Sequence, residues 1–174
     1  NKPAGVRDAA LLAVLYGCGL RRSELVALET GDYDKPTGGL TIRAGKGNKQ
    51  RIVYVRNGGA RALDAWLRTR SDKPGAIFCP VGRDGTITVR PMSAQAVYMI
   101  LKALGERAGV ASFSCHDCRR THISHLLDAG ADLVVVQHLA GHANVQTTAR
   151  YDRRGDEAKR KASGLLTIPY EGEG

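Results

Sequence analysis

Long hydrophobic stretches are missing from this sequence. No apolar run approaches the roughly 18 residues that a membrane-spanning helix requires. The first five residues, Asn-Lys-Pro-Ala-Gly, lack the apolar segment of a signal peptide and an initiator methionine. Internal repeats and low-complexity segments are missing as well. We therefore expect a single domain over residues 1–174, cut from a longer protein whose N-terminal partner domain is absent, with no membrane contact.

Cysteines and acidic residues are also scarce. The four cysteines do not form a disulfide framework in a chain of 174 residues, which favours a reducing, cytoplasmic environment. Lys and Arg number 26 against 17 Asp and Glu, giving a net charge of +9. Such a surface attracts polyanions, because each cation placed on a phosphate releases condensed counterions. Charge alone fits nucleic-acid binding and simple solubility equally well.

The spacing of apolar residues predicts mainly helix. Helical spacing covers residues 6–16, a second helix begins near Arg21 and ends before Gly31, and further helices cover residues 60–69 and 93–107. Short strands around residues 40–42 and 52–54 flank a glycine-rich turn, and residues 32–34 supply a third strand. The last third reads as short helices at 116–129, 133–139, 145–151 and 156–166. The fold class is α+β, mainly α with a small three-stranded antiparallel sheet.

Arginines occur where they can bind a phosphate. Arg21 and Arg22 stand at the start of a predicted helix, where backbone N–H groups already favour an anion. Glu24 follows Arg21 by three residues and can orient it, whereas an ordinary exposed helix start is the alternative. His116 and Arg119 share one face of another helix by the same spacing, so both can reach one phosphate.

The glycine-rich turn between the strands is strongly basic. Arg43, Lys46, Lys49 and Arg51 fall within nine residues that contain no acid. A hairpin tip of this kind can approach a DNA backbone closely, and a lysine there can donate a proton. The alternative is an edge hairpin that lysines protect from aggregation.

A histidine and a tyrosine end the set of candidate groups. His142 follows a glycine at a helix junction, and Tyr151 comes nine residues later. Either residue alone is most often a packing or hydrogen-bonding residue. The set as a whole is informative, because it combines two arginine sites, a lysine hairpin, two histidines and a tyrosine on different elements. These are the groups that phosphoryl transfer without a metal requires.

The order of these motifs resembles the tyrosine recombinases of the phage-integrase family. Gly-Leu-Arg-Arg-Ser-Glu-Leu (19–25) is similar to their first arginine box, and Gly-Lys-Gly-Asn-Lys-Gln-Arg (45–51) resembles their lysine hairpin. His-Asp-Cys-Arg-Arg (116–120) is similar to their His-x-x-Arg box. Leu-Ala-Gly-His (139–142) and Thr-Thr-Ala-Arg-Tyr (147–151) resemble their closing histidine and nucleophile. Each motif alone is weak, but all occur in order over nearly the whole chain.

The resemblance implies a catalytic domain that breaks and rejoins DNA strands. Tyr151 would attack the scissile phosphate and become joined to the 3′-phosphate, while Arg21 and Arg119 hold the phosphate oxygens and His142 donates to them. The bond energy is kept in the phosphotyrosine, so no cofactor is expected. Tyrosine has an ordinary pKa of about 10, so a cationic pocket is needed to favour its phenolate at neutral pH.

The resemblance also implies proton transfers and partners. Lys46 would protonate the leaving 5′-oxygen, and His116 would assist proton transfer at Tyr151. Expected partners are double-stranded DNA and, on synapsis, three further copies in a tetramer formed from monomers. Residues 155–174 form a C-terminal helix and tail that dock either on a neighbouring protomer or on their own domain. The predicted DNA-binding residues, of which Arg120 stands where many relatives carry histidine, are Arg22, Arg43, Lys49, Arg51 and Arg120.

Three other readings compete with this one. Cys115, Cys118, His122 and His125 have a spacing that suggests zinc, but four positions along one straight helix span about 15 Å and cannot surround one ion. A DNA-binding module without catalysis would leave the candidate catalytic set unused. A type IB topoisomerase would use a similar tyrosine attack without a second DNA site.

Overall fold

The computed structural model describes residues 2–43, 50–71, 73–167 and 169. It contains the predicted small sheet and is otherwise mainly helical. The sheet has the antiparallel order β1 (Tyr33–Asp34), β2 (Gly39–Ile42) and β3 (Arg51–Tyr54). Leu40 lies opposite Val53, and Ile42 lies opposite Arg51. The predicted α+β class and the third strand are therefore confirmed.

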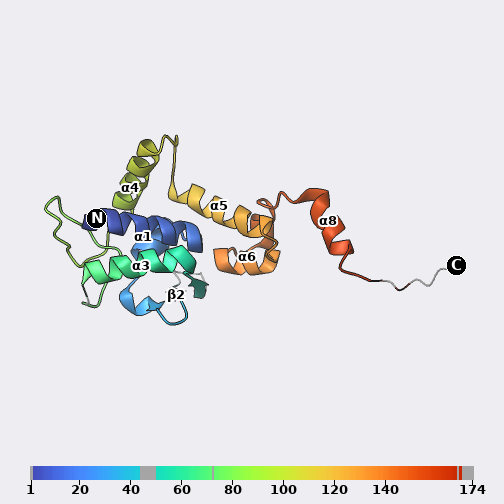
Figure 1. Cartoon of the computed structure of the whole chain (residues 1–174), viewed down its shortest axis with the longest axis horizontal. Helices are drawn as coiled ribbons and strands as arrows, with labels where there is room; N and C mark the ends of the chain where they lie inside the picture. The colour runs from blue at the N-terminus through green and yellow to red at the C-terminus, as the bar shows by residue number, and fades with distance from the viewer. Residues whose placement is uncertain (1, 44–49, 72, 168, 170–174) are drawn as a thin grey trace.

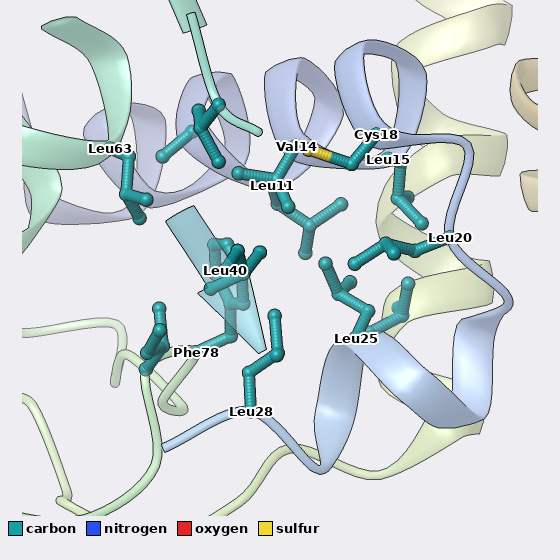
Figure 2. Close-up of a cluster of buried hydrophobic side chains, with 14 of the residues drawn as sticks. Leu11, Val14, Leu15, Cys18, Leu20, Leu25, Leu28, Leu40, Leu63 and Phe78 are labelled. Atoms are coloured by element: carbon teal, nitrogen blue, oxygen red, sulfur yellow. The ribbon is translucent and has the colours of Figure 1, made fainter. Parts of the chain in front are cut away.

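The main hydrophobic core lies between the sheet and α1 (Pro3–Cys18), which packs against α3 (Asn57–Arg70). Leu11, Val14 and Leu15 recur at helical spacing and are fully buried. Figure 2 shows them pointing toward Leu40 of β2, with further apolar side chains closing the cluster from the following loop and helix. These further side chains include Leu20, Leu25 and Leu28. Burial of each large aliphatic side chain contributes roughly 1.5–3 kcal/mol.

The second helix is shorter than predicted. The sequence predicts a helix that continues up to Gly31, but α2 (Arg22–Val26) already ends at Val26, and Thr30–Asp32 forms a separate 3₁₀ turn. The carbonyl of Leu28 accepts the N–H of Ile77 at 2.8 Å, and Glu29 forms a bridge with Ala76. This extended pairing requires a backbone that is incompatible with helix, which is why α2 stops.

A second, smaller hydrophobic cluster lies where α5 (Cys115–Asp128) meets α6 (Leu133–Ala140). Ile123, Leu127, Val136 and Ala140 are its buried members, and Tyr151 packs against them. α4 (Ala94–Arg107) precedes this region, and its N-cap Ser93 accepts the N–H of Ala96, as its sequence predicts. α5 therefore joins the main core to the small cluster.

The last helix lies at the far side of the molecule from the start of α1 (Figure 1). After α7 (Val145–Ala149), helix α8 (Gly155–Ser163) has no buried residue, and Leu165 and Leu166 are 80% and 79% exposed. Docking of this segment on its own domain or on a neighbouring protomer stays a prediction. No helix in the described part of the chain is both long and apolar enough to span a bilayer.

Candidate active site

Glu24, near the start of α2, makes hydrogen bonds to two arginines. Its carboxylate accepts from Nη1 of Arg21 at 2.8 Å and from the backbone N–H of Arg21 at 2.8 Å, the contact that the spacing predicts. The same carboxylate accepts two hydrogen bonds from Arg51 of β3, at 2.9 and 2.8 Å. Paired two-point contacts of this kind fix the plane of a guanidinium as well as its position.

The Glu24 carboxylate is charged at any pH near neutrality. Burial pushes its pKa upward, but the hydrogen bonds from Arg51 and Arg21 outweigh burial and hold the pKa at about 2. The side chains of Glu24 and Arg51 are only 9% and 10% exposed, so little water screens the pair. Glu24 thus serves as a fixed anchor for both arginines.

Three arginines meet at the C-terminal end of α6. The carbonyl oxygens of the last turn of a helix have no partners within the helix and carry partial negative charge. Arg51 donates to the carbonyl of residue 139 at 2.9 Å, Arg119 to that of residue 140 at 2.5 Å, and Arg21 to that of residue 141 at 3.2 Å. The arginine that caps the start of α2 and the arginines of β3 and α5 therefore meet at one point.

The backbone at this point leaves room only for glycine. Gly141 ends α6 with φ of 66°, and a Cβ there would lie 2.9 Å from Nη1 of Arg51. Gly19 ends α1 in the same left-handed conformation, and its carbonyl accepts from Nη1 of Arg119 at 2.6 Å. Arg119 therefore bridges the ends of two helices, α1 and α6.

The guanidiniums repel one another, and the site compensates only in part. Burial first, and then Arg21, lower the pKa of Arg119 to about 10, while Glu24 raises it. Arg119 stays charged at pH 7 because its pKa remains well above that pH. Arg21, Arg51 and Arg119 together carry three positive charges against the one negative charge of Glu24, so the cluster has an excess of two. An anion is the ligand that would balance it.

His142 and Tyr151 stack beside this cluster. Their rings are parallel to within 21°, with centroids 6.5 Å apart. Burial, followed by Arg119, Arg21 and Arg51, lowers the pKa of His142 to about 4, so the imidazole is neutral at pH 7. Its Nδ1 is 2.9 Å from the hydroxyl of Thr148. A neutral imidazole beside cations can offer an N–H to an oxyanion without adding charge.

A cleft of about 290 Å³ opens over the arginines. Arg21 and Arg119 line it together with Arg22 and the exposed His116, so four of the predicted residues share one opening. Tyr98 of α4 and Cys115 of α5 also line it. The size of the cleft and the positive charge of its lining suit a phosphate group that enters from solvent.

Tyr151 faces a neighbouring groove instead of lining that cleft. This groove runs along α5 and includes Arg120, Asp117 and Arg153. Arg120 is exposed there and has no hydrogen bond or ion pair within the described residues. Tyr151 is nevertheless close enough to Arg119 that a charge on its phenolate would raise the pKa of that guanidinium, against the larger effects of burial and Arg21.

The basic hairpin is described only at its two ends. Lys46 and Lys49 lie outside the described residues. Arg43, predicted to bind DNA, is exposed and paired with Asp32 at 2.7 Å and Glu29 at 3.2 Å. Arg51, predicted for the same role, turns inward: its guanidinium is committed to Glu24 and α6. Its strand explains the difference, because Arg51 shares a sheet face with buried Val53, while Ile52 and Tyr54 face solvent.

Two polar residues that the sequence motifs do not single out hold the site in place. Thr148 has no predicted role within the motif of residues 147–151, yet it is fully buried and hydrogen-bonded to the histidine. Gln137 of α6 donates from Nε2 to the carbonyl of His142 at 3.0 Å. The pair of threonines before the tyrosine was the available signal. Gln137 had no signal in its local sequence.

The four residues with zinc-like spacing are used in packing along α5. Cys118 belongs to the main core, and His122 lies against Gly19, where a Cβ would collide with its ring. His125 is paired through Nδ1 with the hydroxyl of Tyr16 at 2.8 Å, and Cys115 lines the cleft. Across the described ranges, no three His, Cys, Asp or Glu side chains are grouped so as to hold a metal ion.

Comparison with known proteins gives a consistent set of relatives. Tyrosine recombinase XerA of Thermococcus kodakarensis is 36% identical over 160 residues, covering 92% of this chain and 55% of that protein. Tyrosine recombinase XerD of Mycobacterium tuberculosis is 41% identical over 157 residues, covering 86% of this chain and 48% of that protein. The chain thus spans about half the length of these relatives.

Solved structures agree with the sequence matches. A crystal structure of XerA recombinase superposes with a TM-score of 0.74 at 26% identity, covering 96% of this chain and 58% of that one. The post-cleavage complex of XerH site-specific recombinase with a palindromic difH substrate superposes with a TM-score of 0.73 at 23% identity, covering 95% and 47%. The phage integrase family matches residues 1–157. The chain belongs to the phage integrase family.

Proposed function

We propose that this chain is the catalytic domain of a site-specific DNA recombinase with Tyr151 as its nucleophile. One observation carries the proposal: an excess of two positive charges is fixed at the end of α6, and a neutral histidine beside it stacks on the tyrosine. Fixed charges that need no rearrangement are the most effective stabilisers of a developing oxyanion. The relatives XerA and XerD are tyrosine recombinases, which agrees with this chemistry.

In the proposed reaction, the phenolic oxygen of Tyr151 forms a bond to phosphorus while the bond from phosphorus to the 5′-oxygen breaks. Arg21 and Arg119 hold the non-bridging oxygens, and His142 donates a further hydrogen bond to them. The tyrosine proton leaves with the help of His116, and Lys46 supplies the proton that the 5′-oxygen needs. A 5′-hydroxyl from a partner strand then reverses these steps, so no cofactor is consumed.

The proposed partners are double-stranded DNA and other copies of the whole protein. A solved structure of the Tn1549 transposon integrase, with a TM-score of 0.64, is a complex with a circular intermediate DNA, and we carry binding of DNA over to the present chain as a proposal. Arg22 and Arg120 are exposed and are offered as DNA-binding residues, together with Arg43 and Lys49. We further propose tetramer formation on DNA synapsis, a cytoplasmic location, and docking of the C-terminal segment, residues 155–174, on a neighbouring protomer.

The proposal is tested with a nicked suicide DNA substrate, which traps a covalent intermediate because the cleaved fragment diffuses away. We expect wild-type protein to form a DNA adduct that survives denaturation, and Tyr151→Phe to form none. Tyr54→Phe is the matched control, since Tyr54 lies on the exposed face of β3, and it should form the adduct normally. Equal adduct in Tyr151→Phe, or none in wild type at saturating DNA, would contradict the proposal.

A further inference from the structure

Thr148 contacts both groups that stack beside the arginines. It lies on α7, three residues before Tyr151, and is fully buried. Its hydroxyl is 2.9 Å from Nδ1 of His142, and its carbonyl accepts the N–H of Tyr151 at 3.0 Å. The reaction proposed above assigns this hydroxyl no role.

The direction of the hydrogen bond from Thr148 follows from burial. A buried hydroxyl hydrogen without an acceptor costs about 1–3 kcal/mol. Within the part of the chain that the structure describes, Nδ1 of His142 is the hydrogen-bond partner of this hydroxyl. A neutral imidazole has one N–H and one lone pair. If the hydroxyl donates, the lone pair is on Nδ1 and the hydrogen is on Nε2.

We propose that Thr148 is a positioning residue that selects the Nε2–H tautomer of His142, so that Nε2 presents a donor to the scissile phosphate. Other contacts already hold the histidine in place, since Gln137 binds its carbonyl and Tyr151 stacks on its ring. Thr148 therefore decides where the proton sits. The inference rests on the proposed function, because the phosphate is what Nε2–H would meet.

The tautomer is measured directly from ¹⁵N chemical shifts of the His142 ring in labelled, DNA-free protein at pH 7. Thr148→Val keeps the branched shape and removes the hydroxyl, Thr148→Ser keeps the hydroxyl, and Thr147→Val changes the exposed neighbour. We expect the Nε2–H form to dominate in wild type, Thr148→Ser and Thr147→Val. In Thr148→Val we expect a mixture with a substantial Nδ1–H fraction. An Nδ1–H form in wild type, or unchanged shifts in Thr148→Val, would overturn the inference.

The rate of adduct formation at saturating DNA gives the second readout. Loss of one fixed donor slows comparable reactions about 10²–10³-fold, so a partial loss should slow Thr148→Val about tenfold or more. DNA affinity should be unchanged, because the arginines remain, and Thr148→Ser should restore the rate. A wild-type rate of adduct formation in Thr148→Val would refute the inference about the tautomer and leave the proposed function standing. Absence of adduct in wild type would refute the proposed function instead, while the ring shifts would still decide the tautomer.

Discussion

At the scale of single residues, arginines of similar sequence context have different roles. Arg51 and Arg22 both lie in basic motifs and were both predicted to bind DNA. The side chain of Arg51 is only 10% exposed and makes hydrogen bonds to Glu24 and to the end of α6, whereas Arg22 is exposed at the rim of the cleft. The first arginine holds the site together, and the second is available to a ligand.

This difference predicts opposite outcomes for two alanine substitutions. Arg51→Ala leaves the carboxylate of Glu24 buried without one of its partners, and breaking such a pair costs about 3–5 kcal/mol of unfolding free energy. Arg22→Ala should change stability by less than about 0.5 kcal/mol, as is usual for exposed positions. It should instead weaken DNA binding and reduce the slope of log affinity against log salt by about 1.

Urea unfolding and DNA titrations over a range of salt concentrations check both variants. An Arg51→Ala protein of wild-type stability would mean that the pair with Glu24 contributes nothing. An Arg22→Ala protein with the wild-type salt slope would mean that Arg22 contacts no phosphate.

At the scale of elements, the C-terminal end of α6 organises the site. Three guanidiniums bind its last carbonyls, and Gly141 lets Arg51 approach the turn. α6 begins where the sequence predicts, because Asp132 caps it by accepting the N–H groups of residues 134 and 135. The hydrogen bonds from the arginines of other elements, in contrast, include two that join residues 88 and 120 positions apart along the chain.

Gly141→Ala and Gly130→Ala form a matched pair that tests this role. Both positions have positive φ, so each alanine costs about 1–2 kcal/mol of backbone strain. Gly141→Ala must also displace the guanidinium of Arg51, whereas a Cβ at Gly130 meets nothing within 4 Å among the described residues. We expect the larger loss of stability and a slower adduct rate only for Gly141→Ala. Equal behaviour of the two variants in urea unfolding and adduct assays would contradict this expectation.

At the scale of the whole molecule, fold class and motif order were predictable from sequence, and side-chain partners were less so. Local patterns located the helices, the strands and the glycine breaks. The inward direction of Arg51 was in fact readable, because strict alternation places it on the face of Val53 and Val55. The pairing of Arg119 with Gly19 and α6 was not readable, since it depends on how α1, α5 and α6 pack together.

Buried histidine makes the stability of the whole domain depend on pH. His122 is 8% exposed, and burial is the main cause that lowers its pKa from 6.5 to about 4. Below pH 6.5 His122 binds a proton in the unfolded chain, whereas in the folded protein it binds one only near pH 4. The free energy of unfolding therefore decreases as the pH falls from 6.5 to about 4. The pKa of His142 is shifted in the same direction. Glu24 contributes a further loss of stability only below pH 4.5, because there its carboxylate is protonated in the unfolded chain but still charged in the folded protein.

We expect His122→Gln to lose less stability than wild type between pH 7 and pH 5. Linkage gives a difference of about 2 kcal/mol for this one residue, because glutamine does not titrate. Urea unfolding at the two pH values measures it, with His138→Gln, at an exposed position, as the control that should match wild type. If His122→Gln loses as much stability as wild type, protonation of His122 is not what weakens the fold in acid.

The small hydrophobic cluster between α5 and α6 allows local opening of the site without unfolding of the whole domain. Its four buried members are separate from the main core, and Tyr151 packs on it. Regions with few buried contacts open more readily than the body of a protein. Such a local opening would carry Tyr151, the proposed nucleophile, away from Arg119 while α1, α3 and the sheet stay folded. The arrangement of side chains that the proposed reaction needs can therefore be lost while the rest of the domain stays folded.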